Sequence, residues 1–191
     1  MKKLILGLTG ASGSAYFVRL GELLCQQELE LHLVASRHGE QVLEFETGHT
    51  AADLADAWRG HRAEVVLEDN ENLFSSAASG SSRFDAMAVV PCSMSTLALL
   101  SHGVSETLLT RAADVMLKER RPLVLVPRET PLTAIHLQNM ASLAQAGAVI
   151  LPAMPGFYGK PKTLEDVIDF MAGKVLDALK IENSCYTRWT G

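Results

Sequence analysis

Short apolar runs alternate along the chain with longer segments in which apolar residues return every three or four positions. The runs have the length and the β-branched content of buried strands, and they occupy 2–9, 30–35, 65–67, 84–91, 123–126 and 148–151. The longer segments have the period of amphipathic helices, at 14–27, 38–47, 48–62, 97–103, 110–118, 131–146 and 163–179. This alternation predicts an α/β fold of three layers, in which a parallel sheet is flanked by helices. The chain is expected to form a single domain over 1–191.

Two helical segments near the end of the chain have clear apolar positions. In the segment 131–146 the apolar positions are Ile135, Leu137, Met140, Leu143 and Ala144. In the segment 163–179 they are Val167, Ile168, Met171, Val175, Leu176 and Leu179. Thr163 and Asp166 have the spacing of a capping box at the start of this last helix, although Asp fits that role less well than Glu or Gln.

Charged residues gather around the strand predicted at 123–126. Pro122 and Pro127 have no N–H group for the sheet and therefore mark the ends of this strand. Arg128 and Glu129 follow at its carboxyl end, the edge at which open α/β sheets bind ligands. The preceding helix presents three charges on one face, at Arg111, Asp114 and Lys118. Together these charges indicate either an anion-binding site or a solvated helix face with a salt bridge in the loop.

A glycine-rich turn, Gly10-Ala11-Ser12-Gly13, joins the first strand to the first helix. Glycines let a ligand approach the backbone, free N–H groups at the helix start can face an anion, and Ser12 adds a hydroxyl donor. The full GxGxxG fingerprint is absent, and the second strand ends at Ser36 instead of the acidic residue that binds an adenosine ribose. As an N-cap, Ser36 would place its hydroxyl at the same edge. The pattern disfavours NAD and favours a mononucleotide such as FMN; the alternative is a plain tight turn.

A second junction of this kind follows the strand at 84–91. Ser93, Ser95 and Thr96 have hydroxyl groups that can donate to a phosphate or to a ribityl chain. Cys92 has no histidine near it in sequence and is interpreted as a buried small residue, not as a nucleophile.

Three segments are less regular. The Ser/Gly-rich tract at 68–83 is either a flexible loop or a binding loop. Tyr158, in a loop with two prolines, is either a packing residue or a ligand contact. The tail at about 181–191 holds Arg188 and Trp189, and it is expected to pack on the domain or on a neighbouring subunit.

Composition and charge restrict the possible functions. The chain has 191 residues, 48% of them apolar and 20% charged, a mix that is typical of globular domains. Its net charge of -5, without a basic stripe, argues against nucleic-acid binding, and no apolar run is long enough for a membrane span. Three cysteines and the lack of a signal-peptide pattern predict reduced thiols in the cytoplasm. The six histidines show no metal-ligand spacing, so no metal site is expected.

Several longer motifs resemble those of the UbiX-type flavin prenyltransferases. They are GASGSAY, ASGS at 78–81, PCSMSTLA, LLTRAADVMLKERRPLVLVPRETPL, GAVILPAMPGFY and the final RW, and the resemblance runs from about residue 3 to residue 189. It implies a Rossmann-like fold, homo-oligomers from trimers to dodecamers, and FMN bound at subunit interfaces. The implied reaction joins the dimethylallyl group of dimethylallyl phosphate to N5 and C6 of reduced FMN without a metal. The product, prenylated FMN, would serve a UbiD-type decarboxylase.

The resemblance also implies roles for single residues. Those that would hold FMN are Gly10, Ala11, Ser12, Ser36, Ser93, Met94, Ser95, Thr96, Arg111 and Arg128. Those that would bind the substrate phosphate are Arg111, Lys118, Arg128, Tyr158 and Lys174. Glu129 would act as acid and base near the flavin, assisted by Glu46, with Lys118 as a third catalytic residue. Lys174 stands where the family usually has Arg, so it offers a point charge instead of a bidentate fork.

Two other functions are compatible with a flavin-binding fold. A flavoprotein cysteine decarboxylase would rely on a histidine early in the chain, for which His32 and His38 are the candidates. A module that delivers FMN without chemistry would have no use for several cations beside an acid. The motifs favour the prenyltransferase over both.

Overall fold

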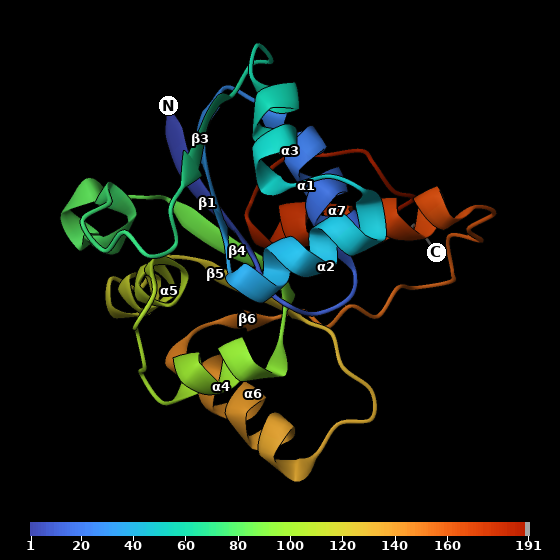
Figure 1. The fold of residues 1–191 in the computed structure, drawn as a ribbon. Coiled ribbons are helices and arrows are strands. Elements are labelled where there is room, and N and C mark those ends of the chain that lie inside the picture. Colours follow the sequence, from blue (N-terminus) through green and yellow to red (C-terminus); the bar gives the residue numbers. More distant parts are fainter. Residues whose placement is uncertain (190–191) are drawn as a thin grey trace.

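Six strands form one parallel sheet in the computed structural model, which describes residues 1–189 (Figure 1). The strands are β1 (Lys2–Leu8), β2 (Leu29–Ala35), β3 (Glu64–Glu68), β4 (Ala86–Cys92), β5 (Leu123–Pro127) and β6 (Val149–Ile150). Their order is β3-β2-β1-β4-β5-β6, and every neighbouring pair is parallel. The parallel α/β sheet expected from the sequence is therefore confirmed.

Helices cover both faces of this sheet. They are α1 (Ser14–Cys25), α2 (Arg37–Thr47), α3 (Ala51–Trp58), α4 (Met94–Ser101), α5 (Leu108–Lys118), α6 (Ala134–Ala146) and α7 (Leu164–Ala178). Successive side chains of a strand face opposite sides, so Leu4 and Leu6 of β1 pack with α1, α3 and α7, whereas Ile5 packs with α4, α5 and α6. The molecule thus has one core on each face of the sheet. Within residues 1–189, no helix is long and apolar enough to cross a bilayer.

The direction of winding changes in the middle of the sheet. From β1 the chain continues to β2 and β3 on one side, whereas β4, β5 and β6 follow on the other. In sheets of this order, the crevice beyond the carboxyl ends of the two central strands is the usual ligand site. Here its walls are the turn after β1 and the start of α4 after β4, the two junctions that the sequence singles out.

The helix α6 differs from the expectation. Met140 and Leu143 are buried, but the side chains of Ile135 and Leu137 are 66% and 53% exposed, and Ala144 is exposed as well. The helix lies at the end of the sheet, beside the two-residue strand β6, and packs against α4 (Figure 1). A short edge strand offers a narrow surface, so the helix beside it buries only a narrow stripe. Three of the five apolar positions of this helix, Ile135, Leu137 and Ala144, therefore lie outside the core of the single chain.

The Ser/Gly-rich tract is ordered along α5. It contains two short 3-10 turns, η1 (Ser76–Ala78) and η2 (Gly80–Ser82). The guanidinium of Arg111 in α5 donates from Nε to the carbonyl oxygen of Ala78 at 3.3 Å. This tract is therefore a structured cover on α5, not a loose loop.

The helix α7 begins with a complete capping box. The Thr163 hydroxyl accepts the N–H of Asp166 at 3.2 Å, and the Asp166 carboxylate accepts the N–H groups of Thr163 at 3.1 Å and Lys162 at 2.7 Å. The N–H groups of Lys162 and Thr163 hold the pKa of Asp166 below its usual value. Asp therefore closes the box as Glu would, and it fixes the loop that leads into α7.

Candidate functional site

Thr9, the residue after β1, bridges the two walls of the crevice. Its hydroxyl donates to the carbonyl oxygen of Pro91 in β4 at 2.9 Å and accepts the N–H of Ser93 at 2.7 Å. The side chain is fully buried, and a buried hydroxyl that satisfies two backbone groups fixes their relative position. Thr9 therefore holds the glycine turn and the start of α4 together. From the sequence it is only the last residue of a strand, because its partners follow 82 and 84 positions later.

An anion does lie at the start of α1, and it is the carboxylate of Glu46. Its Oε2 atom accepts the N–H groups of Gly13 at 3.0 Å and Ser14 at 2.8 Å. Glu46 keeps contact with solvent, and although desolvation opposes its charge, the Ser12 hydroxyl and these N–H groups outweigh that effect and lower its pKa. Glu46 is therefore charged and occupies N–H groups that the sequence pattern suggested for a phosphate.

Ser93 organises the start of α4. Its hydroxyl accepts the N–H of Thr96 at 3.2 Å, and its carbonyl oxygen accepts the N–H of Leu97 at 2.9 Å. The first N–H groups of a helix have no partner inside the helix, so those of Met94 and Ser95 are available to a ligand. The start of α4 thus presents donors suited to a phosphate or a ribityl hydroxyl. The binding of FMN by these residues stays a prediction, which this geometry supports.

Cys92 lies just before these donors but is chemically inert. Its side chain is fully buried, and burial raises the pKa of its thiol to about 12. Because the thiolate is the nucleophilic form, a thiol that stays protonated at neutral pH does not attack a substrate. The interpretation of Cys92 as a buried small residue is confirmed.

Arg128 and Glu129 follow β5 beside the glycine turn. The Nε of Arg128 donates to the carbonyl oxygen of Ser12 at 3.1 Å, which ties the end of β5 to the turn after β1. Glu129 is exposed, and its Oε1 accepts the N–H of Thr130 at 2.9 Å. These contacts are with backbone groups, so the alternative of a salt bridge in this loop does not describe Arg128 and Glu129. The structure instead places a cation and an acid at the crevice.

Ser36 and Gly10 form the side of the crevice next to β2. The Ser36 hydroxyl accepts the N–H of Gly39 at 3.1 Å and caps α2, as the sequence predicts. Gly10 lies against the exposed residue His38 so closely that an added Cβ would be 2.6 Å from the Cβ of His38. Glycine is therefore required at position 10 for the turn to pack on α2.

His32, the other early histidine, is buried inside the sheet. Its Nδ1 lies 2.6 Å from the carboxylate of Glu68, and its Nε2 lies 2.8 Å from that of Glu30. One ring nitrogen thus links β2 to Glu68 of β3, and the other contacts Glu30 within β2. His32 is therefore absent from the crevice, where a cysteine decarboxylase would require its histidine.

Tyr158 belongs to a second cluster, between the loop before α7 and the tail of the chain. The Tyr158 ring meets those of Phe170 in α7 at 5.7 Å and Trp189 in the tail at 5.9 Å, both edge to face. Lys174 follows Phe170 by four positions and so lies on the same side of α7. The tail thus contacts the domain up to Trp189, and positions 190 and 191 lie outside the described residues.

Arg111 lies on the outer side of α5, together with Asp114 and Lys118, as their spacing predicts. Its Nη1 pairs with the Asp114 carboxylate at 2.8 Å. The opposite side of α5 is packed against the sheet through Ala112, Ala113, Val115 and Met116. In the single chain this face is therefore only partly solvated: Lys118 is exposed, whereas Arg111 also donates to Ala78 of the Ser/Gly-rich tract.

Lys118 is separated from the crevice by the length of β5. It is the last residue of α5, and α5 returns the chain to the amino edge of the sheet, where β5 begins. The five residues of β5 span roughly 16 Å before Arg128 is reached at the other edge. Lys118 instead pairs with Glu119 at 2.8 Å. Within one chain, the structure does not bring Lys118 to the other predicted site residues.

The crevice has the chemistry that FMN needs. The free N–H groups of Met94 and Ser95 suit phosphate or ribityl oxygens, and the uncovered backbone at Gly10 lets a flat ring come close. Arg128 adds positive charge at the rim. A dinucleotide would need an acid at the end of β2, where Ser36 stands. The donor set therefore fits FMN better than NAD.

We predict that Thr9→Val weakens FMN binding about tenfold, because the part-buried N–H of Ser93 and the buried carbonyl of Pro91 lose their shared partner. The start of α4 would then no longer be fixed against the glycine turn. Titration of flavin fluorescence measures the affinity, and thermal unfolding measures the accompanying loss of stability. Thr9→Ser keeps the hydroxyl and is expected to behave like the wild type. Wild-type FMN affinity in Thr9→Val would show that Thr9 does not position the crevice.

Comparisons with known proteins show the family of this chain. The model of the Flavoprotein family matches residues 1–176. A flavin prenyltransferase UbiX of Alkalihalophilus pseudofirmus is 46% identical over 192 residues, which cover 98% of this chain and 96% of the relative.

Two solved structures are similar along nearly the whole chain. A dodecameric FMN-dependent UbiX-like decarboxylase from Escherichia coli O157:H7 is 42% identical, with a TM-score of 0.92, and the match covers 99% of this chain and 100% of that one. AnUbiX, solved with FMN and dimethylallyl pyrophosphate, is 40% identical, also with a TM-score of 0.92, over 100% of this chain and 98% of that one. By the family match and these identities, the chain belongs to the flavoprotein family and, within it, to the UbiX-type flavin prenyltransferases.

Proposed function

We propose that this chain joins the dimethylallyl group of dimethylallyl phosphate to N5 and C6 of reduced FMN, without a metal ion. Its 46% identical relative is a flavin prenyltransferase, and AnUbiX was solved with FMN and dimethylallyl pyrophosphate. Within this chain, the strongest support is the hydrogen bond from Arg128 to Ser12, because it holds a cation and the neighbouring acid, Glu129, at the crevice.

The charges around the crevice match the needs of this reaction. When the allylic C–O bond breaks, its electron pair leaves with the phosphate, and fixed cations stabilise the developing charge. Arg128 at the crevice would supply such charge, and Lys174 and the Tyr158 hydroxyl, which lie beside α7, would add contacts to the phosphate. FMN, when bound and reduced, supplies the nucleophilic ring atoms. Glu129 would donate a proton to the double bond of the transferred group and accept the proton that C6 releases when the second bond to the ring forms, while the charged Glu46 holds the glycine turn in place.

Arg111 and Lys118 can take part only if a second copy of the chain brings them to the crevice. Both lie on the outer side of α5, and Lys118 is at the far edge of the sheet. We propose that this chain forms a homo-oligomer, from trimer to dodecamer, in which α5 of one copy completes the crevice of another. A dodecameric relative supports this, and the exposed apolar side chains of Ile135 and Leu137 fit a contact between copies.

The use of the product and the place of action are further parts of the proposal. Prenylated FMN would be passed to a UbiD-type decarboxylase, as the family resemblance implies. The three cysteines are free thiols, two of them buried, which agrees with a reducing compartment such as the cytoplasm.

The direct test is to incubate the protein with reduced FMN and dimethylallyl phosphate without oxygen and without added metal. We expect flavin with the added mass of one C5 unit, detected by mass spectrometry of the extracted cofactor. A parallel reaction with the diphosphate shows which donor is preferred. If the flavin mass stays unchanged with both donors, this chain is not a flavin prenyltransferase.

A further inference from the structure

Three side chains of the tail bind the same carboxylate of α7, that of Asp177. Arg188 binds both oxygens of Asp177 with its two Nη atoms, at 2.7 Å and 2.9 Å, the bidentate geometry that makes such pairs strong. The hydroxyl of Tyr186 donates to the same carboxylate at 2.6 Å, and the side-chain amide of Asn183 at 2.8 Å. These donors, led by Arg188, hold the pKa of Asp177 at about 2. The Asp177 carboxylate, which anchors the tail, is therefore charged at every pH near neutrality.

A row of four aromatic rings connects this anchor to Tyr158. Tyr186 meets Phe170 at 5.3 Å, Phe170 meets Tyr158 at 5.7 Å, and Tyr158 meets Trp189 at 5.9 Å, all close to perpendicular. Edge-to-face contacts of this kind are favourable and directional. Tyr158 is thus held between α7 on one side and the tail on the other, while its own side chain stays 45% exposed.

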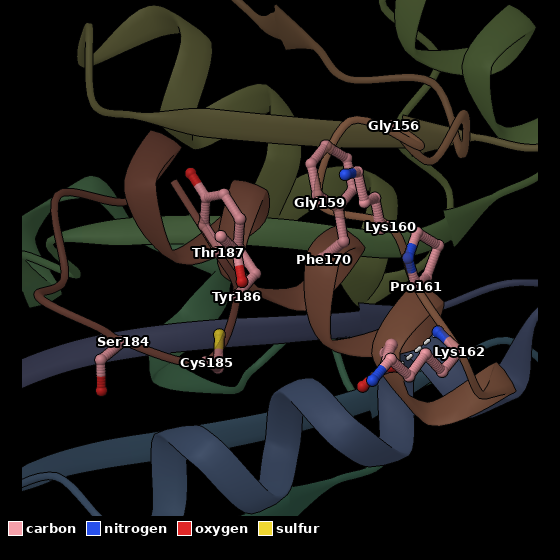
Figure 2. A pocket seen from close by; sticks show the side chains of 11 residues that line it. Gly156, Gly159, Lys160, Pro161, Lys162, Phe170, Ser184, Cys185, Tyr186 and Thr187 are labelled. Carbon is pink, nitrogen blue, oxygen red and sulfur yellow. Dashed lines mark hydrogen bonds between the residues drawn. The ribbon is translucent and has the colours of Figure 1, made fainter. Parts of the chain in front are cut away.

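The space between the loop and the tail is a hollow of about 430 Å³ (Figure 2). Figure 2 shows Tyr186 and Thr187 of the tail on one side, Gly159 and Lys160 of the loop on the other, and Phe170 beneath them. The loop and the tail therefore do not pack directly against each other across this hollow. Their relative position is instead fixed by the ring contacts of Tyr158 and the hydrogen bonds to Asp177.

Gly173 in α7 makes room for this arrangement. A Cβ added there would lie 2.2 Å from Cδ1 of Tyr186, a contact that the ring could relieve only by moving. Glycine is a poor residue for the middle of a helix. Its presence here is explained by the close approach of the tail and not by any need of the helix itself.

We propose that 183–189 is a strap that positions Tyr158, with Asp177 and Gly173 as the residues that hold the strap in place. The proposal rests on the proposed function insofar as Tyr158 binds the phosphate of dimethylallyl phosphate. Holding the ring of Tyr158 between Phe170 and Trp189 removes conformational freedom before the phosphate arrives, so less is lost on binding. The strap would thus raise the affinity for the phosphate, although Asp177 itself does not contact the phosphate.

Two variants loosen the strap by different routes. Asp177→Asn weakens the bidentate pair with Arg188. Gly173→Ala displaces Tyr186, although alanine favours the helix itself, so a loss of function could not be ascribed to a weaker α7. Asp56→Asn is the matched control, because it makes the same change in an exposed Asp–Arg pair on α3.

The affinity for dimethylallyl phosphate is measured by calorimetry on FMN-loaded protein, and the state of the strap by the rate of tryptic cleavage after Arg188. We expect both variants to bind dimethylallyl phosphate about tenfold more weakly, to keep their FMN affinity, and to be cleaved faster, while Asp56→Asn matches the wild type. In a Tyr158→Phe background, Asp177→Asn should add little further loss, because the two changes act through the same hydroxyl.

Faster cleavage with unchanged affinity for dimethylallyl phosphate would overturn the proposal, and so would wild-type cleavage in both variants. A full additional loss in the Tyr158→Phe background would show that the strap acts elsewhere. Wild-type protein that binds dimethylallyl phosphate but forms no prenylated flavin would refute the proposed function alone, since the strap is judged by binding and cleavage.

Discussion

Glu129→Gln is expected to slow prenyl transfer by about 10²- to 10⁴-fold, the usual contribution of a positioned acid or base. Glutamine has the same shape and keeps an oxygen for the N–H of Thr130, which Glu129 accepts at 2.9 Å, so the loop after β5 should keep its conformation. It cannot take up the proton that leaves when the second bond to the flavin forms. Single-turnover formation of prenylated flavin, followed by mass spectrometry, measures the loss.

FMN affinity and thermal stability of this variant should match the wild type. Glu44→Gln, an equal change of charge at an exposed position of α2, should leave the rate unaltered and serves as the control. Loss of FMN binding in Glu129→Gln would instead assign Glu129 a structural role.

Hybrid oligomers of Lys118→Met and Glu129→Gln chains are expected to recover roughly a quarter of the wild-type activity, although each variant alone is nearly inactive. A crevice that takes Glu129 from one copy and Lys118 from another is intact only where the right two chains meet. The physical basis is the position of Lys118 on the outer side of α5, at the edge of the sheet opposite to Arg128. Co-expression of the two variants, purification of the mixed oligomer and a rate measurement test this.

The control for this experiment pairs Lys118→Met chains with chains that have both substitutions, because no crevice in that mixture contains both native residues. Native mass spectrometry shows whether mixed oligomers have formed. Activity no higher than in this control, in oligomers shown to be mixed, would mean that Lys118 and Glu129 do not serve the same site.

The strands were predictable because each is a compact apolar run with its own boundary signals. Pro122 and Pro127 bracket β5 in the sequence, and the structure begins and ends β5 at Leu123–Pro127. The helix α6 was predicted in the right place, but only part of its apolar face is buried. Periodicity reports how apolar residues are arranged within a helix, whereas the width of the buried stripe depends on its neighbour, here the two-residue strand β6.

The sequence indicates those parts of the site in which residues a few positions apart bind one another. Ser36 and Ser93 are N-caps of the helices that follow them, and both accept an N–H group three residues later. Two contacts at the crevice have no signal in the sequence. Glu46 reaches the N–H groups of Gly13 and Ser14 from more than thirty positions away, and Thr9 joins two strands that are neighbours only in the folded sheet.

The sequence by itself determined the alternation of strands and helices, the glycine turn, the capped helix starts and the charges that follow β5, because hydrophobic period, backbone conformation and capping act over a few residues. Only the tertiary structure decided which of these features meet. In the folded chain β4 lies beside β1, and Glu46 accepts the N–H groups at the start of α1. The tail contacts Tyr158, and Lys118 lies away from the crevice of its own chain. The physical reason is that a side chain's partners are set by strand order and helix orientation, which depend on the packing of the entire core.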